Sequence, residues 1–111
     1  MPMDIFKITG PVRLDGEITV GGSKNSALPI IAASLLAAGK STLRGVPNLS
    51  DISVMCKLIE DMGCKTAADK GAIAIDATTI DKPVGDYEIV RKMRASICIL
   101  GPLLARCGKV E

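Results

Sequence analysis

The chain has 111 residues, enough for one small domain, and its 14 basic and 12 acidic side chains give a net charge of +2. One Tyr, one Phe and no Trp leave no aromatic platform for bases to stack on, so we expect no nucleic-acid partner. The four cysteines lack close spacing and no histidine is present, so we expect no bound metal. Residues 1–6 lack the apolar core of a signal peptide, and the longest apolar stretch, residues 27–38, is too short and too interrupted to span a bilayer, so we expect a cytoplasmic protein with reduced thiols and no membrane partner.

The first predicted elements are two strands between Phe6 and Val20. Even positions in this stretch are mostly apolar and odd positions mostly polar, which is the period of a strand with one buried face. A turn at residues 21–23 follows, and residues 26–38 form a nearly all-apolar stretch typical of a buried helix. Because Pro29 fits best in a first helical turn, we expect the N-cap near Ser26 and the end at Gly39.

A strand over residues 41–46 and a second helix complete the first half. Ser50 or Asp51 should cap this helix and Gly63 should end it, with apolar residues on one face at Ile52, Met55, Leu58, Ile59 and Met62. Residues 64–69 and 72–77 then predict a hairpin around Lys70-Gly71.

The pattern begins again at Tyr87. Residues 87–90 suggest a strand, and residues 91–107 suggest another apolar helix ended by Gly108. Lys24-Asn25-Ser26 and Arg94-Ala95-Ser96 both place a basic residue two before a serine at the head of an apolar helix, about 70 residues apart. This offset predicts a repeated βαβαββ unit in an α/β (α+β) fold, and a chain that stops at Glu111 inside the second unit is expected to be a fragment.

A candidate anion site lies at residues 21–25, where a glycine turn leads into a helix. Free N–H groups, the helix dipole and Lys24 together would suit phosphate or carboxylate, although Lys24 could equally be a solvated loop residue. Arg94 takes the matching place in the second unit, where a surface arginine is the simpler interpretation. Asp51 is interpreted as a helix cap and not as a catalytic acid.

Two other features have a plain structural interpretation. Gly39-Lys40-Ser41-Thr42 resembles the end of a P-loop, but Ser34 occupies the place of its first glycine and the residues follow a helix where a P-loop opens one. We interpret these residues as the C-cap of that helix, with Lys40 near the negative end of its dipole. All four cysteines, Cys56, Cys64, Cys98 and Cys107, are expected to be buried and structural, since no histidine is available to activate a thiol.

Two motifs carry a family resemblance. Residues 16–29, Gly-Glu-Ile-Thr-Val-Gly-Gly-Ser-Lys-Asn-Ser-Ala-Leu-Pro, resemble the opening motif of the UDP-N-acetylglucosamine enolpyruvyl transferases. Met93-Arg94-Ala95-Ser96-Ile97 and the following residues 100–106 resemble a second motif of that family. The nearest relatives, the enolpyruvylshikimate phosphate synthases, have a Ser and then an Asn-Arg pair after the shared Gly-Ser-Lys, where this chain has Asn25-Ser26-Ala27-Leu28-Pro29 with no arginine.

The resemblance implies an enzyme that moves the enolpyruvyl group of phosphoenolpyruvate to the 3-hydroxyl of UDP-N-acetylglucosamine, without metal or organic cofactor, in peptidoglycan synthesis. Lys24 and Asn25 would bind phosphoenolpyruvate and Arg94 would bind the sugar nucleotide. The catalytic cysteine would lie beyond Glu111, so no catalytic residue is expected in this chain.

The family fold is an inside-out α/β barrel with two lobes of three units each. Residues 1–20 would then belong to the second lobe, and residues 21–111 would form about one and a half units of the first. The remainder of the enzyme, as a second polypeptide or a continuation of this one, would be the main partner. The alternatives are an enolpyruvylshikimate phosphate synthase-like transferase, a non-catalytic module of the same fold and, less favoured, an RNA-end-processing protein.

Overall fold

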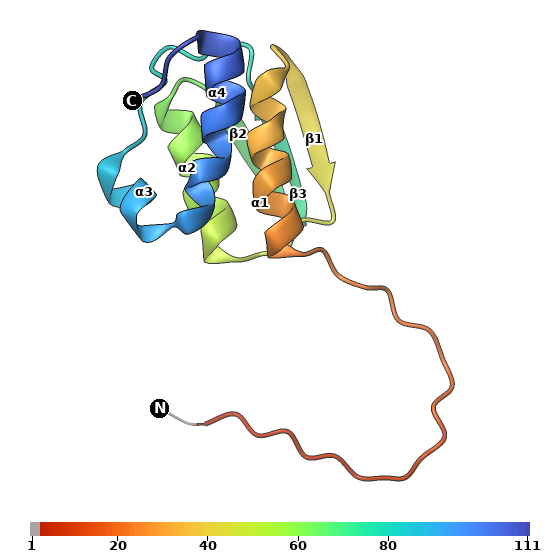
Figure 1. Cartoon of the computed structure of the whole chain (residues 1–111). Coiled ribbons are helices and arrows are strands. Elements are labelled where there is room, and N and C mark those ends of the chain that lie inside the picture. Colours follow the sequence, from red (N-terminus) through yellow and green to blue (C-terminus); the bar gives the residue numbers. More distant parts are fainter. Residues whose placement is uncertain (1–2) are drawn as a thin grey trace.

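A layer of helices covers one face of a three-stranded antiparallel sheet in the computed structural model, which describes residues 3–111 (Figure 1). The elements follow in the order α1 (Lys24–Ala33), η1 (Ser34–Leu36), β1 (Lys40–Arg44), α2 (Ser50–Asp61), β2 (Lys65–Asp69), β3 (Ala72–Asp76), α3 (Tyr87–Lys92), η2 (Arg94–Ile99) and α4 (Leu100–Cys107), where η marks a 3₁₀ helix. The mixed architecture confirms the predicted fold class.

The sheet has the strand order β1-β3-β2, and its central strand pairs with both neighbours. The predicted hairpin is confirmed, because Asp69 pairs with Ala72 across a two-residue turn. Lys70 and Gly71 in that turn have φ angles of 43° and 77°, as the tight turn of a right-twisted hairpin requires. Ile73 and Ile75 of β3 are buried under the helices and form the floor of the core.

The first helix begins earlier and ends earlier than predicted. Ser23 stands at the N-cap, so Pro29 lies inside α1 and not in its first turn. The chain then tightens into η1 and is extended at Ala37, before it reaches Gly39. The expected all-round burial is also wrong for this chain, because Ile30 and Leu36 are 49% and 57% exposed.

The second helix has the amphipathic face that its sequence predicts. All five apolar residues of that face are buried, from Ile52 to Met62, and Gly63 with φ 115° ends the helix. The predicted cap is wrong, since Leu49 occupies the N-cap position and Ser50 is already helical. Helix α2 packs against α1 and β2 and so joins the helical layer to the sheet.

The predicted strand at residues 87–90 is instead the helix α3. Asp86 caps it, because its Oδ1 accepts a hydrogen bond of 3.1 Å from the Ile89 amide. The long helix predicted over residues 91–107 is broken at Met93, which has extended backbone angles, and continues as η2 and α4 up to Gly108. The two halves of the 70-residue repeat pack together, α1 on η2 and η1 on α4.

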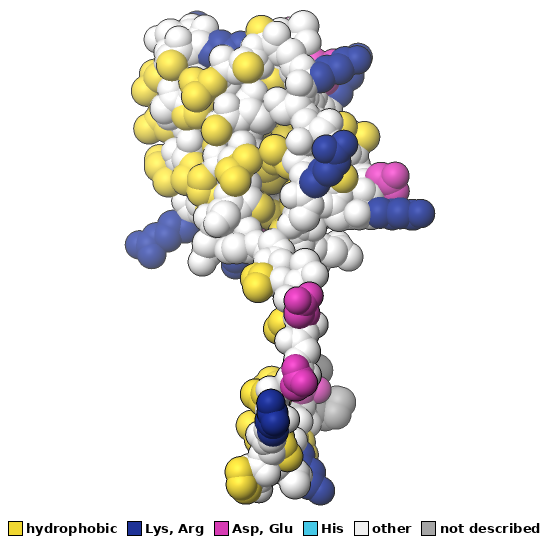
Figure 2. Space-filling model, turned by 90° about the vertical axis from the view of Figure 1, so that its right-hand side faces the viewer, with side chains coloured by type: hydrophobic (Ala, Val, Ile, Leu, Met, Phe, Trp, Pro, Cys, Tyr) yellow, Lys and Arg dark blue, Asp and Glu magenta, His cyan; other side chains and the backbone are white. Residues whose placement is uncertain are grey.

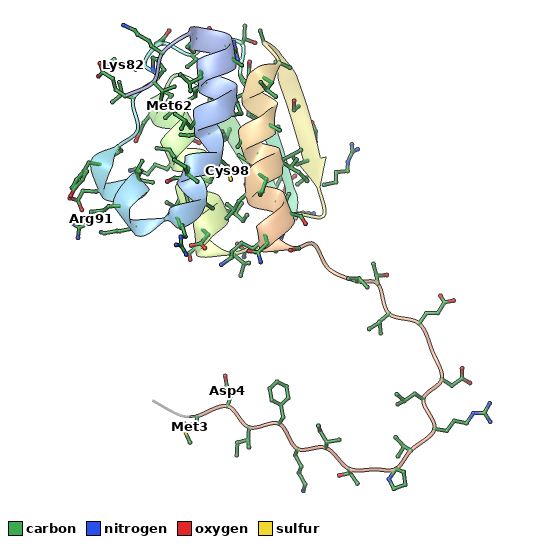
Figure 3. The ribbon with its side chains drawn as sticks, viewed as in Figure 1. Met3, Asp4, Met62, Lys82, Arg91 and Cys98 are labelled. Atoms are coloured by element: carbon green, nitrogen blue, oxygen red, sulfur yellow. The ribbon has the colours of Figure 1, made fainter. Side chains whose placement is uncertain are left out.

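Residues 3–22 run away from the globular part without regular secondary structure (Figures 1 and 3). The two strands predicted between Phe6 and Val20 are not formed within the described chain, and Phe6 is 95% exposed. Met3 and Asp4 lie at the far end of this segment (Figure 3). The expectation that it pairs with strands of a second lobe stays a prediction.

The outer side of the helical layer is apolar. Figure 2 shows hydrophobic side chains gathered along one side of the globular part. The exposed large hydrophobic residues of α1, η1, η2 and α4 are Ile30, Leu36, Ile97, Leu100 and Leu104. Over residues 3–111, every helix is too short or too polar to cross a bilayer.

Candidate functional site

The start of α1 is an uncapped helix terminus next to a glycine turn. Ser23 makes no side-chain hydrogen bond to the first turn, and the first amide with a partner in the helix is that of Ala27, which bonds the Ser23 carbonyl at 2.9 Å. The amides before it therefore point their N–H groups outward at the positive end of the helix dipole. This part of the chain has the physical properties of an anion-binding site.

Gly22 holds this helix start against the rest of the fold. A Cβ at this position would lie 2.9 Å from the Gly45 carbonyl carbon, closer still to its oxygen, and 3.2 Å from Cδ of Pro47. Only glycine allows such an approach of two backbones. The loop touched by Gly22 leads directly into α2, so the starts of α1 and α2 are held together.

A depression of about 590 Å³ lies where these helix starts meet η2. Lys24, Asn25 and Leu28 line it from α1, Asp51 from α2, and residues 92–95 with Ile97 from the segment that enters and forms η2. The structure thus places Lys24, Asn25 and Arg94, the three residues predicted as a site, in one depression although they lie up to 70 residues apart. That they bind substrates stays a prediction.

The charges of the depression favour an anion. Within residues 3–111, three cations line it, Lys24, Lys92 and Arg94, against the single carboxylate of Asp51. Asp51 forms an ion pair with Lys24, with Nζ and Oδ2 3.0 Å apart. The cap predicted for Asp51 is therefore wrong, and its role as the partner of Lys24 was missed because the two residues are 27 positions apart in the sequence.

The cysteines are less uniformly buried than predicted. Cys64 is buried, but Cys56, Cys98 and Cys107 are only partly buried, and none of the four lines the depression. Cys98 on η2 lies beside α1 (Figure 3). Burial raises the pKa of the Cys64 thiol, with an opposing effect of the nearby Arg106, so the thiol stays protonated near neutral pH.

The P-loop-like residues lie away from the depression. Lys40 to Thr42 form the beginning of β1, an edge strand, and Gly39 accepts a hydrogen bond from the Ala77 amide at 2.9 Å. A strand follows this glycine where a P-loop would have a helix. The helix cap that we expected in place of a P-loop is also absent, because the preceding helix already ends at Leu36.

Arg106 is a structural residue that the sequence did not single out beyond its motif. Its Nη1 donates to the Leu35 carbonyl at 3.0 Å, and its Nη2 donates to the Thr78 carbonyl at 2.9 Å. The guanidinium thereby ties α4 to the end of η1 and to the loop after β3. The repeat packing described above depends in part on this side chain.

A better enclosed cleft, of about 530 Å³, lies between α2 and the β2–β3 hairpin. Its lining includes the apolar residues Ile52 and Ile73, and its charged residues Glu60, Asp69 and Lys70 carry more negative than positive charge. The described residues that line it include no cluster of cations, so the more open depression at the helix starts is the stronger candidate for an anionic ligand.

Comparison with known proteins gives one family. The profile of the family described as EPSP synthase (3-phosphoshikimate 1-carboxyvinyltransferase) matches residues 8–111. The chain is 49% identical over 98% of its length to the UDP-N-acetylglucosamine 1-carboxyvinyltransferase of Methylacidiphilum infernorum. It is 46% identical over the same share to the protein of that name from Psychrobacter sp.. The chain spans about a quarter of the length of these relatives, 26% and 25% respectively.

A solved structure shares the fold. The enolpyruvyl transferase NikO from Streptomyces tendae superposes with a TM-score of 0.75 over 86% of this chain and 22% of its own, at 22% sequence identity. At that identity the likeness concerns the fold alone.

Proposed function

Because the chain belongs to the EPSP synthase (3-phosphoshikimate 1-carboxyvinyltransferase) family, we propose that the whole protein containing it is an enolpyruvyl transferase that acts on UDP-N-acetylglucosamine. It would transfer the enolpyruvyl group of phosphoenolpyruvate to the 3-hydroxyl of the sugar and release phosphate. In this proposal the reaction is the first committed step of peptidoglycan synthesis. The protein would then act in the cytoplasm and contribute to cell-wall formation.

One observation supports this proposal most directly. Lys24 and Arg94, from the two motifs, line the same basic depression at the uncapped start of α1. Both reactants of the proposed reaction carry phosphate groups, and a helix start with three nearby cations suits them. The names of relatives 44–49% identical to the chain favour the sugar nucleotide as the acceptor.

In the proposed reaction, addition to the enol carbon precedes elimination of phosphate. The Lys24 ammonium would bind the phosphate of phosphoenolpyruvate and neutralise the charge that grows as the C–O bond breaks. Asn25 would lie beside that phosphate. The Arg94 guanidinium, whose fork matches phosphate oxygens, would hold the sugar nucleotide. The cysteine proposed to act in catalysis lies beyond Glu111.

The domain assignment belongs to the same proposal. Residues 1–20 would pair with strands of a second lobe, and residues 21–111 would form the first βαβαββ unit and the start of the next. The exposed apolar side of α1 and α4 would then be covered by the remaining units. The three large hydrophobic residues on this side, Ile30, Leu100 and Leu104, are each at least 40% exposed, which supports a partner within the whole protein.

The test measures phosphate release by the full-length protein. We expect release from phosphoenolpyruvate only with UDP-N-acetylglucosamine, and Arg94→Ala should raise KM for the nucleotide by at least about tenfold, as loss of a charged hydrogen bond would. Arg91→Ala, an exposed arginine on α3, is the control and should change little. Activity with shikimate 3-phosphate instead would establish the other acceptor, and inactivity with both would favour a non-catalytic module.

A further inference from the structure

Among the described residues that line the depression, Asp51 is the only carboxylate beside the three cations. It lies in the first turn of α2, and its Oδ2 is 3.0 Å from Nζ of Lys24. The two side chains are 41% and 42% exposed, so water reaches the pair. In the described part of the chain no side chain caps α2, which leaves the carboxylate of Asp51 free for the lysine.

The pair limits where the lysine ammonium can go. Lysine is a point charge on four flexible methylenes, and without a partner it samples many rotamers at the mouth of the depression. The close contact between Gly22 and the Gly45 carbonyl keeps the two helix starts at a fixed separation. Asp51 therefore holds the ammonium at a defined place in the depression, which Asn25 and Arg94 also line.

The Lys24–Asp51 ion pair is weak enough for the lysine to change its partner from the carboxylate to a phosphate group. A solvent-exposed ion pair of this kind changes an equilibrium constant by roughly 1.5- to 5-fold. A phosphate group at the same place would gain the ammonium, the outward N–H groups of α1 and the other cations, which together outweigh one exposed carboxylate. The Lys24 ammonium can thus leave the Asp51 carboxylate for a phosphate group at a small cost in free energy.

We propose that Asp51 is the positioning residue for Lys24, holding its ammonium in the free protein and yielding it to the phosphate of the incoming substrate. This inference rests on the proposed function for the identity of that substrate. The carboxylate has two opposite effects, because it orders the lysine and also repels the anion. Its removal should therefore affect substrate binding and turnover in opposite directions.

The experiment is a double-mutant cycle in the full-length protein. Asp51→Asn should lower KM for phosphoenolpyruvate by roughly 2- to 5-fold, since the anion loses a competitor. The same change should lower kcat by roughly tenfold, since misplacement of a reacting group by a fraction of an ångström is costly. Asp51→Glu keeps the charge and should restore most of kcat. Asp61→Asn, at the far end of the same helix, is the control.

Coupling to Lys24 decides the proposal. Lys24→Ala should lower turnover by orders of magnitude, and adding Asp51→Asn to it should change kcat by less than about twofold if Asp51 acts through the lysine. A further loss as large as in the wild-type background, or a fall in kcat without a fall in KM, would overturn the role.

A second readout separates this inference from the proposed function. Calorimetric titration with inorganic phosphate needs no turnover, and Asp51→Asn should tighten binding in the wild type but not in Lys24→Ala. If the protein showed no transferase activity, the proposed function would be wrong, but the phosphate titration would still test whether Asp51 acts on anion binding through Lys24. Equal effects in both backgrounds would refute the pair as a determinant of anion binding.

Discussion

Because Gly22 lies against the Gly45 backbone, the substitution Gly22→Ala, which adds one methyl group, tests how the start of α1 is positioned. In Gly22→Ala the new Cβ would lie 2.9 Å from the Gly45 carbonyl carbon, a distance that real Cβ atoms essentially never show. The obstacle is backbone, which cannot rotate aside as a side chain can. One of the two segments must therefore move, either the start of α1 or the loop that leads to α2.

The size of the effect follows from this geometry. A displacement on the order of 1 Å, at the cost of overpacking, should lower the free energy of unfolding by roughly 1–3 kcal/mol. Because Lys24 follows two residues after Gly22, the same displacement should weaken binding of phosphoenolpyruvate. Gly21→Ala is a matched control, since its Cβ would meet nothing within 4 Å.

The assay compares the two variants in the full-length protein. For Gly22→Ala, urea unfolding should show a lower free energy of unfolding, and peptides covering residues 21–50 should lose protection from hydrogen exchange. Gly21→Ala should be neutral or slightly stabilising. KM for phosphoenolpyruvate should rise in Gly22→Ala and stay unchanged in Gly21→Ala. Equal stability and equal KM in the two variants would show that the close approach does not shape the site.

Two further predictions concern the support of the fold. Arg106→Gln should lower the free energy of unfolding in urea by roughly 1–3 kcal/mol, because the Leu35 and Thr78 carbonyls lose a charged donor. The exposed Arg91→Gln should lower it by less than about 0.5 kcal/mol. Equal losses in the two variants would contradict the structural role of Arg106. Burial raises the pKa of the Cys64 thiol above its ordinary value, so iodoacetamide should modify it at pH 8 more slowly in the folded than in the urea-unfolded protein. Modification of the folded protein at the unfolded rate would contradict the raised pKa. The raised pKa also contributes stability below the unfolded pKa of the thiol, and this contribution is lost as the pH rises through the folded pKa, so the free energy of unfolding should fall above about pH 9.

Local signals predicted the elements that depend on local chemistry. The hairpin follows from Lys70-Gly71, where a tight turn needs two positive φ angles, and α2 follows from its apolar period and Gly63. The strand at residues 87–90 was wrong because four residues are too few to distinguish the two periods. Asp86 gave a cap signal that would have identified the helix.

Tertiary packing determined the remainder. Pro29 suggested a later start for α1, but its missing amide is tolerated inside the helix on an exposed side. Lys24 was a candidate because a glycine turn before a helix suits an anion, whereas the roles of Asn25 and Arg94 came from the family resemblance. Asp51 could not be assigned in this way, because an aspartate near a helix start looks like a cap until the neighbouring helix brings a lysine within 3.0 Å.

The exposed segment before α1 has a consequence for self-association. Its alternating apolar side chains and free backbone groups form a single unpaired ribbon, which offers a template for a second chain to add a strand. Gly10-Pro11 and Gly16 divide that ribbon into short runs, and the charges of Arg13 and Glu17 lie among its apolar residues. These interruptions shorten any intermolecular ladder and act as gatekeepers against fibre-like assembly whenever the segment lacks its own partner.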